Sequence, residues 1–337
     1  MARKPKIHVI GTGGTISGAG DTATAGAYQS GAVEAAQLIA AVDGLDRLAD
    51  VSAETIFATG SENLGPVQWR QLARRIEEVC ASNDVDGVVV THGTDTLEEA
   101  AFYLDLVCRA NKPVALTAAM RPATALSADG PANLFQAALS ISSPHFQGGG
   151  VFVVMNTQVI AGWQAIKTSS VALDSFCAYP GGSVARVVGE SLMMIGGRQS
   201  SPLAGRFHGV LEKDEELPVV DIVALRGGCG DRPLSNANTN DCKGLVIAGF
   251  GSGTMPDTLA AEAADMARSG TVVVVSSRVG RVMVSAHSTS TRLDDGVIPS
   301  GCLNPQKSAV LLSLALADGL DAAEIAGLFQ LFSASSQ

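Results

Sequence analysis

Short runs of aliphatic residues alternate with segments of helical periodicity along the first half of the chain. Runs that are apolar at nearly every position predict buried strands, because a strand covered on both faces has no polar side. The predicted strands are Ile7–Ile10, Val85–Thr91, Pro113–Thr117 and Val151–Met155. The alternation is typical of a parallel sheet whose connections are helices.

Two of the connecting helices have clear signals. The first covers residues 65–81 and begins near Pro66, because proline is favoured in the first helical turn. Its apolar residues recur at three- and four-residue steps and so form one face. These residues are Trp69, Leu72, Ile76 and Val79. The second helix begins at Thr96, whose spacing to Glu99 matches a capping box.

The chain has 337 residues, more than one hydrophobic core usually holds, so we expect two domains. The periodic patterns stop around residues 196–217, where a glycine- and serine-rich run precedes a charged stretch. We predict a larger N-terminal parallel-sheet α/β domain over residues 1–196, a linker over 197–217 and a smaller C-terminal α/β domain over 218–337. The last domain contains predicted strands at Val219–Leu225, Leu245–Ala248 and Val272–Val275 and predicted helices near 257–268 and 305–318.

Charge and the N-terminal segment narrow the class of ligand and the compartment. The formal net charge is −10 and no Lys/Arg cluster occurs, which argues against binding nucleic acid or an anionic membrane and favours a small-molecule substrate. Residues 1–6 lead directly into the first strand without an apolar signal segment, and no stretch is long enough to span a bilayer. We expect a cytoplasmic protein as the chain is written. A periplasmic or secreted location is the alternative if a signal peptide has been removed.

The six cysteines are dispersed and form no CxxC pair, which argues against a zinc site or a thioredoxin-type motif. We expect reduced packing residues. In a secreted protein one disulfide could form, and Cys80–Cys108 is the candidate pair, because both flank the strand Val85–Val90 and the helix that follows it.

A glycine-rich turn, Gly11–Ile16, follows the first predicted strand directly. It is not a dinucleotide-binding turn, because Ile16 occupies the position of the third glycine in a GxGxxG motif. The glycines would let backbone N–H groups stabilise an oxyanion beside a threonine hydroxyl that attacks a carbonyl. Thr12 and Thr15 both qualify, and local chemistry does not choose between them. A purely structural turn is the alternative.

A second polar cluster, Thr91–Thr96, lies at the end of a predicted buried strand, where ligands bind in open α/β sheets. The simple alternative is that Asp95 and Thr96 cap a helix and that His92 is a buried, hydrogen-bonded histidine. A third candidate is Lys167. A lysine desolvated beside an aspartate and a threonine could act as a base or hold a proton relay in place.

Taken together, four motifs resemble those of the bacterial-type L-asparaginase family, in the same order and over nearly the whole chain. They are Gly13–Ile16, Thr91–Thr96, Met120–Pro122 followed by Ser127–Pro131, and Leu303–Lys307. The resemblance implies that Thr15, assisted by Tyr28 at the far end of a mobile lid, attacks a side-chain amide to give an acyl-enzyme that water cleaves. It also implies a second catalytic triad of Thr94, Asp95 and Lys167.

The resemblance further implies the substrate contacts. Ser61 and Glu62 would hold the α-carboxylate and α-amine of L-asparagine, or alternatively L-glutamine, with Thr94 and Asp95 adjoining and Asp95 sharing the amine. Ala119 would offer its carbonyl to the leaving nitrogen. Many members carry Gln at the position of Glu62, and Glu there is associated with greater tolerance of glutamine. No cofactor and no metal are implied, and the expected assembly is a homotetramer, a dimer of dimers.

Two positions depart from the family pattern. In many secreted-type members an acidic residue from a neighbouring subunit completes the first triad, but residues 278–300 contain no Glu, and their acids are Asp294 and Asp295. Many family members also have an Asn in a glycine-rich turn of the C-terminal domain, and the corresponding residue in this chain is Ser252. Two other functions therefore stay open beside asparagine hydrolysis. They are a glutaminase subunit that feeds ammonia to a transamidation partner and an amino-acid-binding sensor without turnover.

Overall fold

The computed structural model describes residues 3–20, 27–197, 200–229, 234, 242–286 and 296–333. The chain forms two compact units, Met1–Leu211 and Glu212–Gln337. Their boundary falls inside the predicted linker 197–217. The first part of that segment packs on the first unit, because Gly205 N–H and Phe207 N–H donate to carbonyls of the helix Leu97–Val107 and Phe207 is 1% exposed.

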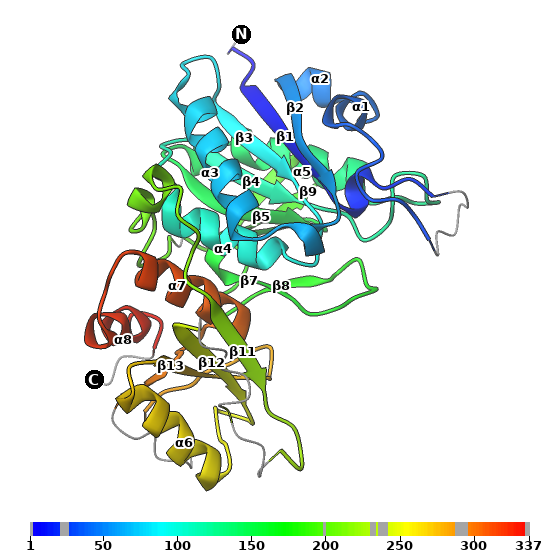
Figure 1. Ribbon diagram of the computed structural model, residues 1–337. Coiled ribbons are helices and arrows are strands. Elements are labelled where there is room, and N and C mark those ends of the chain that lie inside the picture. The colour runs from blue at the N-terminus through cyan, green and yellow to red at the C-terminus, as the bar shows by residue number, and fades with distance from the viewer. Residues whose placement is uncertain are drawn as a thin grey trace. The chain divides into compact units, whose positions relative to one another are not determined.

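The first unit contains a sheet in which eight strands of the described residues are paired in the order β10-β9-β6-β5-β4-β3-β1-β2. Figure 1 labels β1 to β5 and β9 of this sheet. The strands are β1 (Lys6–Gly13), β2 (Asp50–Thr59), β3 (Gly87–Thr91), β4 (Pro113–Thr117), β5 (Gly150–Met155), β6 (Gln158–Ala161), β9 (Ala185–Val188) and β10 (Ser191–Met194). Strands β2, β1, β3, β4 and β5 are parallel, whereas β6, β9 and β10 continue the sheet in antiparallel fashion. A separate antiparallel pair joins β7 (Ala165–Lys167) to β8 (Phe176–Ala178).

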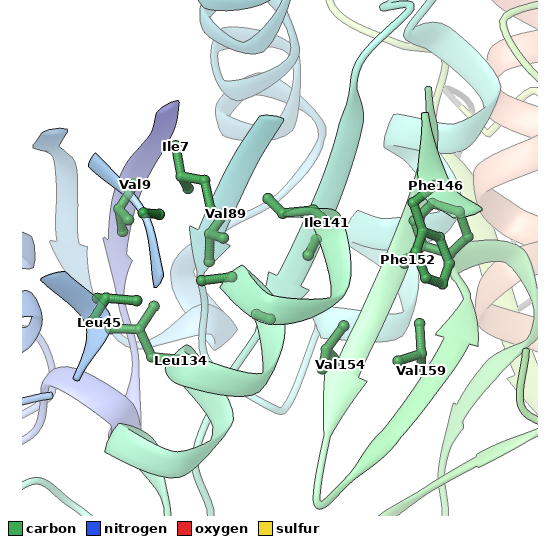
Figure 2. Close-up of a cluster of buried hydrophobic side chains, with 14 of the residues drawn as sticks. Ile7, Val9, Leu45, Val89, Leu134, Ile141, Phe146, Phe152, Val154 and Val159 are labelled. Atoms are coloured by element: carbon green, nitrogen blue, oxygen red, sulfur yellow. The ribbon is translucent and has the colours of Figure 1, made fainter. Parts of the chain in front are cut away.

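Helices cover both faces of the parallel part of the sheet. They are α1 (Ala35–Ala40), α2 (Leu45–Leu48), α3 (Pro66–Ala81), α4 (Leu97–Val107) and α5 (Gly130–Ser142). Helix α5 packs on β3, β4 and β5 and contacts α1 and α2, while α3 and α4 contact each other. On the α5 side, Ile7, Val9, Val89 and Leu134 belong to one buried apolar cluster, which Figure 2 shows between the helix and the strands.

The second unit is also α/β. Its four described strands form a wholly parallel sheet in the order β11-β12-β13-β14. The elements are β11 (Val220–Ala224), β12 (Gly244–Gly249), β13 (Val272–Ser277), β14 (Val297–Pro299), α6 (Asp257–Arg268), α7 (Pro305–Ala317) and α8 (Ala322–Gln330). The predicted fold class, a larger parallel-sheet α/β domain and a smaller α/β domain, is therefore confirmed.

One helix signal was misread. Thr96 is the N-cap residue of α4, but its side chain makes no capping bond, so the predicted capping box with Glu99 is wrong. The Thr96 hydroxyl instead donates to the carbonyl of Ser61, 2.9 Å away. A threonine hydroxyl can either cap a helix or bond to a distant carbonyl. Here it makes the distant bond, which holds the loop after β2 against the start of α4.

All six cysteines are free thiols in this structure, including Cys80 and Cys108. Burial raises the pKa of Cys80 to about 11 and raises that of Cys108 well above its usual value. Both thiols therefore stay protonated at neutral pH and act as apolar packing groups.

Candidate active site

The candidate residues gather where the parallel strands end. The register pairs Gly11 of β1 with Thr91 of β3, Thr91 with Thr117 of β4, and Gly13 with Thr59 of β2. The loops that follow these four strands therefore leave the same edge of the sheet. The loops after β1, β2, β3 and β4 carry Thr15, Ser61, Thr94 and Ala119 respectively. Four of the predicted site segments, far apart in sequence, are thus neighbours because the strands are parallel.

Glycines let these loops touch. Gly14 has φ +79°, and a Cβ added there would lie 2.3 Å from the Cα of Gly93. A Cβ on Gly93 would lie 2.6 Å from the Ser61 hydroxyl oxygen. Backbone approaches this close are available only to glycine. Thr15 and Thr94, the next residues along each loop, therefore belong to two loops whose backbones touch.

The structure distinguishes the two threonines of the glycine-rich turn. Thr12 is fully buried, and its hydroxyl donates to the carbonyl of Thr91 at 3.0 Å, so it joins two strands. The Thr15 hydroxyl lies 2.6 Å from the hydroxyl of Tyr28, whose side chain is 40% exposed. Only Thr15 faces a partner that can exchange a proton at an accessible surface.

The two ends of the predicted lid, which begins at Gly18 after the glycine-rich turn and has Tyr28 at its far end, are well defined. Ala19 and Gln29 exchange two backbone hydrogen bonds, and a Cβ on Gly18 would lie 2.6 Å from the Tyr28 ring. Gly20 is held on both sides by the Thr124 hydroxyl, which accepts from its N–H and donates to its carbonyl. Residues 21–26 of the predicted lid lie outside the described residues. These anchored ends fix where the Tyr28 ring stands relative to Thr15.

Thr94, Asp95 and Lys167 form a second connected group. The Lys167 ammonium donates to the Thr94 hydroxyl at 2.9 Å and to the Asp95 carboxylate at 2.6 Å. Thr94 is 6% exposed, the Lys167 side chain 18%, while the Asp95 side chain is 66% exposed. The lysine thus bridges a buried hydroxyl and a solvated carboxylate, the arrangement that a proton relay requires.

Ser61 and Glu62 lie beside this group. The Ser61 side chain is 2% exposed, and its hydroxyl oxygen accepts the N–H of Asp95 at 3.2 Å, which leaves its own proton available for a ligand. Glu62 is exposed and accepts a hydrogen bond from the Asn63 amide at 3.3 Å. A hydroxyl donor and a carboxylate at one loop suit the two charged ends of an amino acid.

Ala119 is fully buried in the turn after β4. A Cβ on Gly130 would lie 2.9 Å from the Ile16 side chain and 3.6 Å from that of Ala119, so Ala119 lies near the Thr15 turn. Asp129, which sequence reasoning noted only within a motif, fixes this turn by accepting the backbone N–H groups of Met120 and Arg121 at 2.9–3.1 Å. The only sequence signal for that role was its place in Ser127–Pro131.

His92 is the buried, hydrogen-bonded histidine of the simpler interpretation. Its side chain is 0% exposed, and Nδ1 donates to the carbonyl of Gly93 at 2.8 Å. Burial lowers the pKa of His92 to about 4, although the Gly93 carbonyl raises it slightly. At neutral pH the imidazole is uncharged, and its hydrogen bond to the Gly93 carbonyl stabilises the turn at Gly93.

This burial makes the protein acid-sensitive. As the pH falls below about 6.5, an unfolded chain protonates His92, whereas the folded protein keeps it neutral to about 4. Protons then bind preferentially to the unfolded state, so stability decreases over this window by roughly 3 kcal/mol. Urea unfolding at pH 7 to 4 should show a weaker pH dependence for His92→Gln than for wild type. The exposed His145→Gln serves as control, and equal dependence in all three proteins would contradict the assignment.

Among the described residues, no group of three or more His, Cys, Asp and Glu side chains could hold a metal ion. In the same part of the chain, no helix is both long and apolar enough to cross a membrane. Of the two departures from the family pattern, Asp294 and Asp295 lie outside the described residues. Ser252 lies in an exposed turn between Gly251 and Gly253, both with positive φ.

Comparison with known proteins agrees with this arrangement. Residues 6–198 match the family described as Asparaginase, N-terminal, and residues 219–329 match the Glutaminase/Asparaginase C-terminal domain. L-asparaginase 2 of Bacillus subtilis (strain 168) is 36% identical over 326 residues, covering 96% of this chain and 86% of that protein. Glutaminase-asparaginase of Pseudomonas fluorescens biotype A is 34% identical over 328 residues, covering 96% and 89%.

A solved structure gives the same result. The Probable Cytoplasmic L-asparaginase from Campylobacter jejuni has a TM-score of 0.87 and 34% sequence identity, over 97% of this chain and 99% of that chain. The similarity covers both units and is not confined to the motifs of the first. This chain belongs to the asparaginase family.

Proposed function

We propose that this protein is an L-asparagine amidohydrolase that converts asparagine and water to aspartate and ammonia. The observation that carries the proposal is the close approach of Gly14 to Gly93, since it sets the Thr15–Tyr28 pair beside the Thr94–Asp95–Lys167 group. The proposed nucleophile Thr15 with its partner Tyr28, and the proposed proton relay with its buried Thr94 hydroxyl, thus lie at the same edge of the sheet.

In the proposed first step, the Thr15 hydroxyl oxygen bonds to the side-chain amide carbon and its proton passes toward Tyr28, 2.6 Å away. The oxyanion that forms is stabilised by backbone N–H groups at the end of the glycine-rich turn, beyond Gly14, whose own N–H donates to the carbonyl of Thr59 at 2.8 Å. The C–N bond then breaks, and the nitrogen takes up a proton and leaves as ammonia beside the carbonyl of Ala119. Water cleaves the acyl-enzyme and restores Thr15.

Thr94, Asp95 and Lys167 supply the second half of the chemistry. Because the Lys167 ammonium donates to both partners, it can give up a proton beside the Thr94 hydroxyl and, once neutral, take a proton from that hydroxyl, while Asp95 balances its charge. The amino acid would be held by the Ser61 hydroxyl at its α-carboxylate and by Glu62 and Asp95 at its α-amine. No cofactor or metal takes part in this proposal.

The direct test is ammonia release from L-asparagine and from L-glutamine by the purified wild-type protein. Release from asparagine is expected, and measurable asparagine binding without any release would instead favour the sensor function. The transamidation alternative is not favoured, because the relatives named asparaginase and glutaminase-asparaginase align with 96% of this chain.

Glu62 is proposed to set the tolerance for glutamine. Glu62→Gln keeps the size of the side chain but removes the negative charge that faces the α-amine of a longer substrate. We expect the ratio of kcat/KM for glutamine to that for asparagine to fall about fivefold, the equivalent of roughly 1 kcal/mol for one contact. The exposed Glu78→Gln on α3 is the control, and an unchanged ratio for Glu62→Gln would contradict the role.

The assembly and the compartment are also proposals. The family resemblance supports a homotetramer, a dimer of dimers, and light scattering on the purified protein should then give about four times the chain mass of 34.4 kDa. A cytoplasmic location is supported by the relative from Campylobacter jejuni, which is described as cytoplasmic. Cell fractionation would test it.

A further inference from the structure

Helix α4 holds a carboxylate that the proposed chemistry does not use. Glu98, in the first turn of α4, is 6% exposed, and its Oε2 accepts the backbone N–H of Lys167 at 2.6 Å. A buried carboxylate is costly unless it accepts hydrogen bonds, and a helix N-terminus favours negative charge. The side chain is therefore well placed to fasten a distant segment to the start of this helix.

The segment it fastens is a short one. Strand β7 has three residues and pairs with β8 alone, outside the large sheet. Thr168 N–H donates across this hairpin to Ser175, and successive N–H groups of a strand point to opposite sides, so Lys167 N–H faces away from β8. The hairpin itself thus cannot bond this group, and Glu98 provides the contact.

Lys167 is consequently attached twice to one stretch of chain. Thr94 and Asp95 bind its ammonium, and Glu98, three residues after Asp95, binds its backbone. The lysine side chain has four rotatable carbon–carbon bonds, so Nζ stays within reach of the Thr94 hydroxyl only if the Lys167 backbone is fixed. A misplacement of about 1 Å in such a group can cost about 10²-fold in rate.

We propose that Glu98 is a positioning residue for amide hydrolysis, because its carboxylate fixes the backbone of Lys167 and so keeps Nζ at the Thr94 hydroxyl. The inference rests on the proposed function. It assigns to Glu98 a task that differs from helix capping: the residue acts on the reaction through Lys167 and touches neither substrate nor nucleophile.

Glu77 offers a matched control. Its carboxylate on α3 accepts the backbone N–H groups of Arg109 at 2.5 Å and Ala110 at 3.1 Å, just beyond the end of α4 remote from Thr94. The eleven residues of α4 separate the two ends by about 16 Å. Glu77→Ala and Glu98→Ala therefore both remove a carboxylate that fastens backbone, but only Glu98 fastens Lys167.

The experiment measures kcat, KM and thermal midpoint for the full-length wild type, Glu98→Ala, Glu98→Gln and Glu77→Ala. We expect Glu98→Ala to lower kcat about 10- to 100-fold with KM changed less than about threefold. Glu98→Gln retains an oxygen acceptor and should recover kcat to within about fivefold. Glu77→Ala should lower the thermal midpoint yet keep kcat within about twofold.

A second arm repeats Glu98→Ala in Lys167→Met, which keeps the backbone N–H but lacks the ammonium. There the change at Glu98 should have little further effect on kcat, because the group that it positions is gone. The same fold loss in both backgrounds, or equal losses for Glu98→Ala and Glu77→Ala, would overturn the positioning role while leaving the proposed function intact. A wild type without ammonia release would overturn both.

Discussion

Thr15→Ala is expected to lower kcat for asparagine by at least about 10²-fold while the protein still folds and binds asparagine. The variant loses the hydroxyl that lies 2.6 Å from Tyr28, and no other described hydroxyl occupies that position. Thr15 is only partly buried, so its truncation should change the free energy of unfolding by no more than about 1 kcal/mol. Ammonia release and calorimetric binding of asparagine measure the two parts separately.

Thr12→Val is the matched control for this prediction. It removes the hydroxyl of the neighbouring threonine, which donates to Thr91 inside the sheet, and keeps the shape of the side chain. We expect a loss of roughly 1 kcal/mol of stability with kcat within a few-fold of wild type. The reverse outcome, loss of turnover in Thr12→Val and retention in Thr15→Ala, would transfer the nucleophile to Thr12.

The choice between these threonines shows what a sequence can and cannot supply. Both stand in one glycine-rich turn, and their local chemistry is the same. They differ in their hydrogen-bond partners: Thr15 lies beside Tyr28, whereas Thr12 bonds the carbonyl of Thr91, 79 residues away. That contact depends on the pairing of β1 with β3, which aliphatic runs predict as strands but not as neighbours.

Three strands that the aliphatic runs do not predict, β2, β9 and β10, have a common physical basis. β2 (Asp50–Thr59) lies at one end of the sheet, and its exposed and part-buried positions mix polar with apolar residues. β9 and β10, near the other end, alternate buried or part-buried with exposed positions over four residues each. The inner strands β3 and β4 are buried at every position, and for that reason their apolar runs were visible.

The site was predictable to the same degree as its strands. The loops after β1 and β3 follow buried aliphatic runs, so their polar residues stood out. Lys167 has no comparable signal, because lysine side chains are usually solvated and because β7, which ends at Lys167, is three residues long and leaves no periodic pattern. Glu98 was hidden for a different reason: a glutamate in a first helical turn is expected for helix stability alone, and only the 2.6 Å contact shows its other partner.

Lys167→Met is expected to lower kcat by at least about 10²-fold with little change in stability. The Asp95 carboxylate that it leaves behind is 66% exposed and remains solvated, so the lost ion pair should contribute less than about 1 kcal/mol to folding. In the variant the buried Thr94 hydroxyl no longer accepts a hydrogen bond from Lys167, so the proton relay is lost. Steady-state ammonia release and urea unfolding on the same preparation test both statements.

Two further variants decide what the lysine contributes. Lys112→Met removes a partly buried lysine that donates to the Ser82 carbonyl at the opposite edge of the sheet, and it should leave kcat within about twofold. Lys167→Arg keeps a positive charge beside Asp95, but a guanidinium does not give up its proton. If Lys167 relays a proton, Lys167→Arg should be nearly as impaired as Lys167→Met, whereas substantial rescue by arginine would mean that the charge alone organises the site.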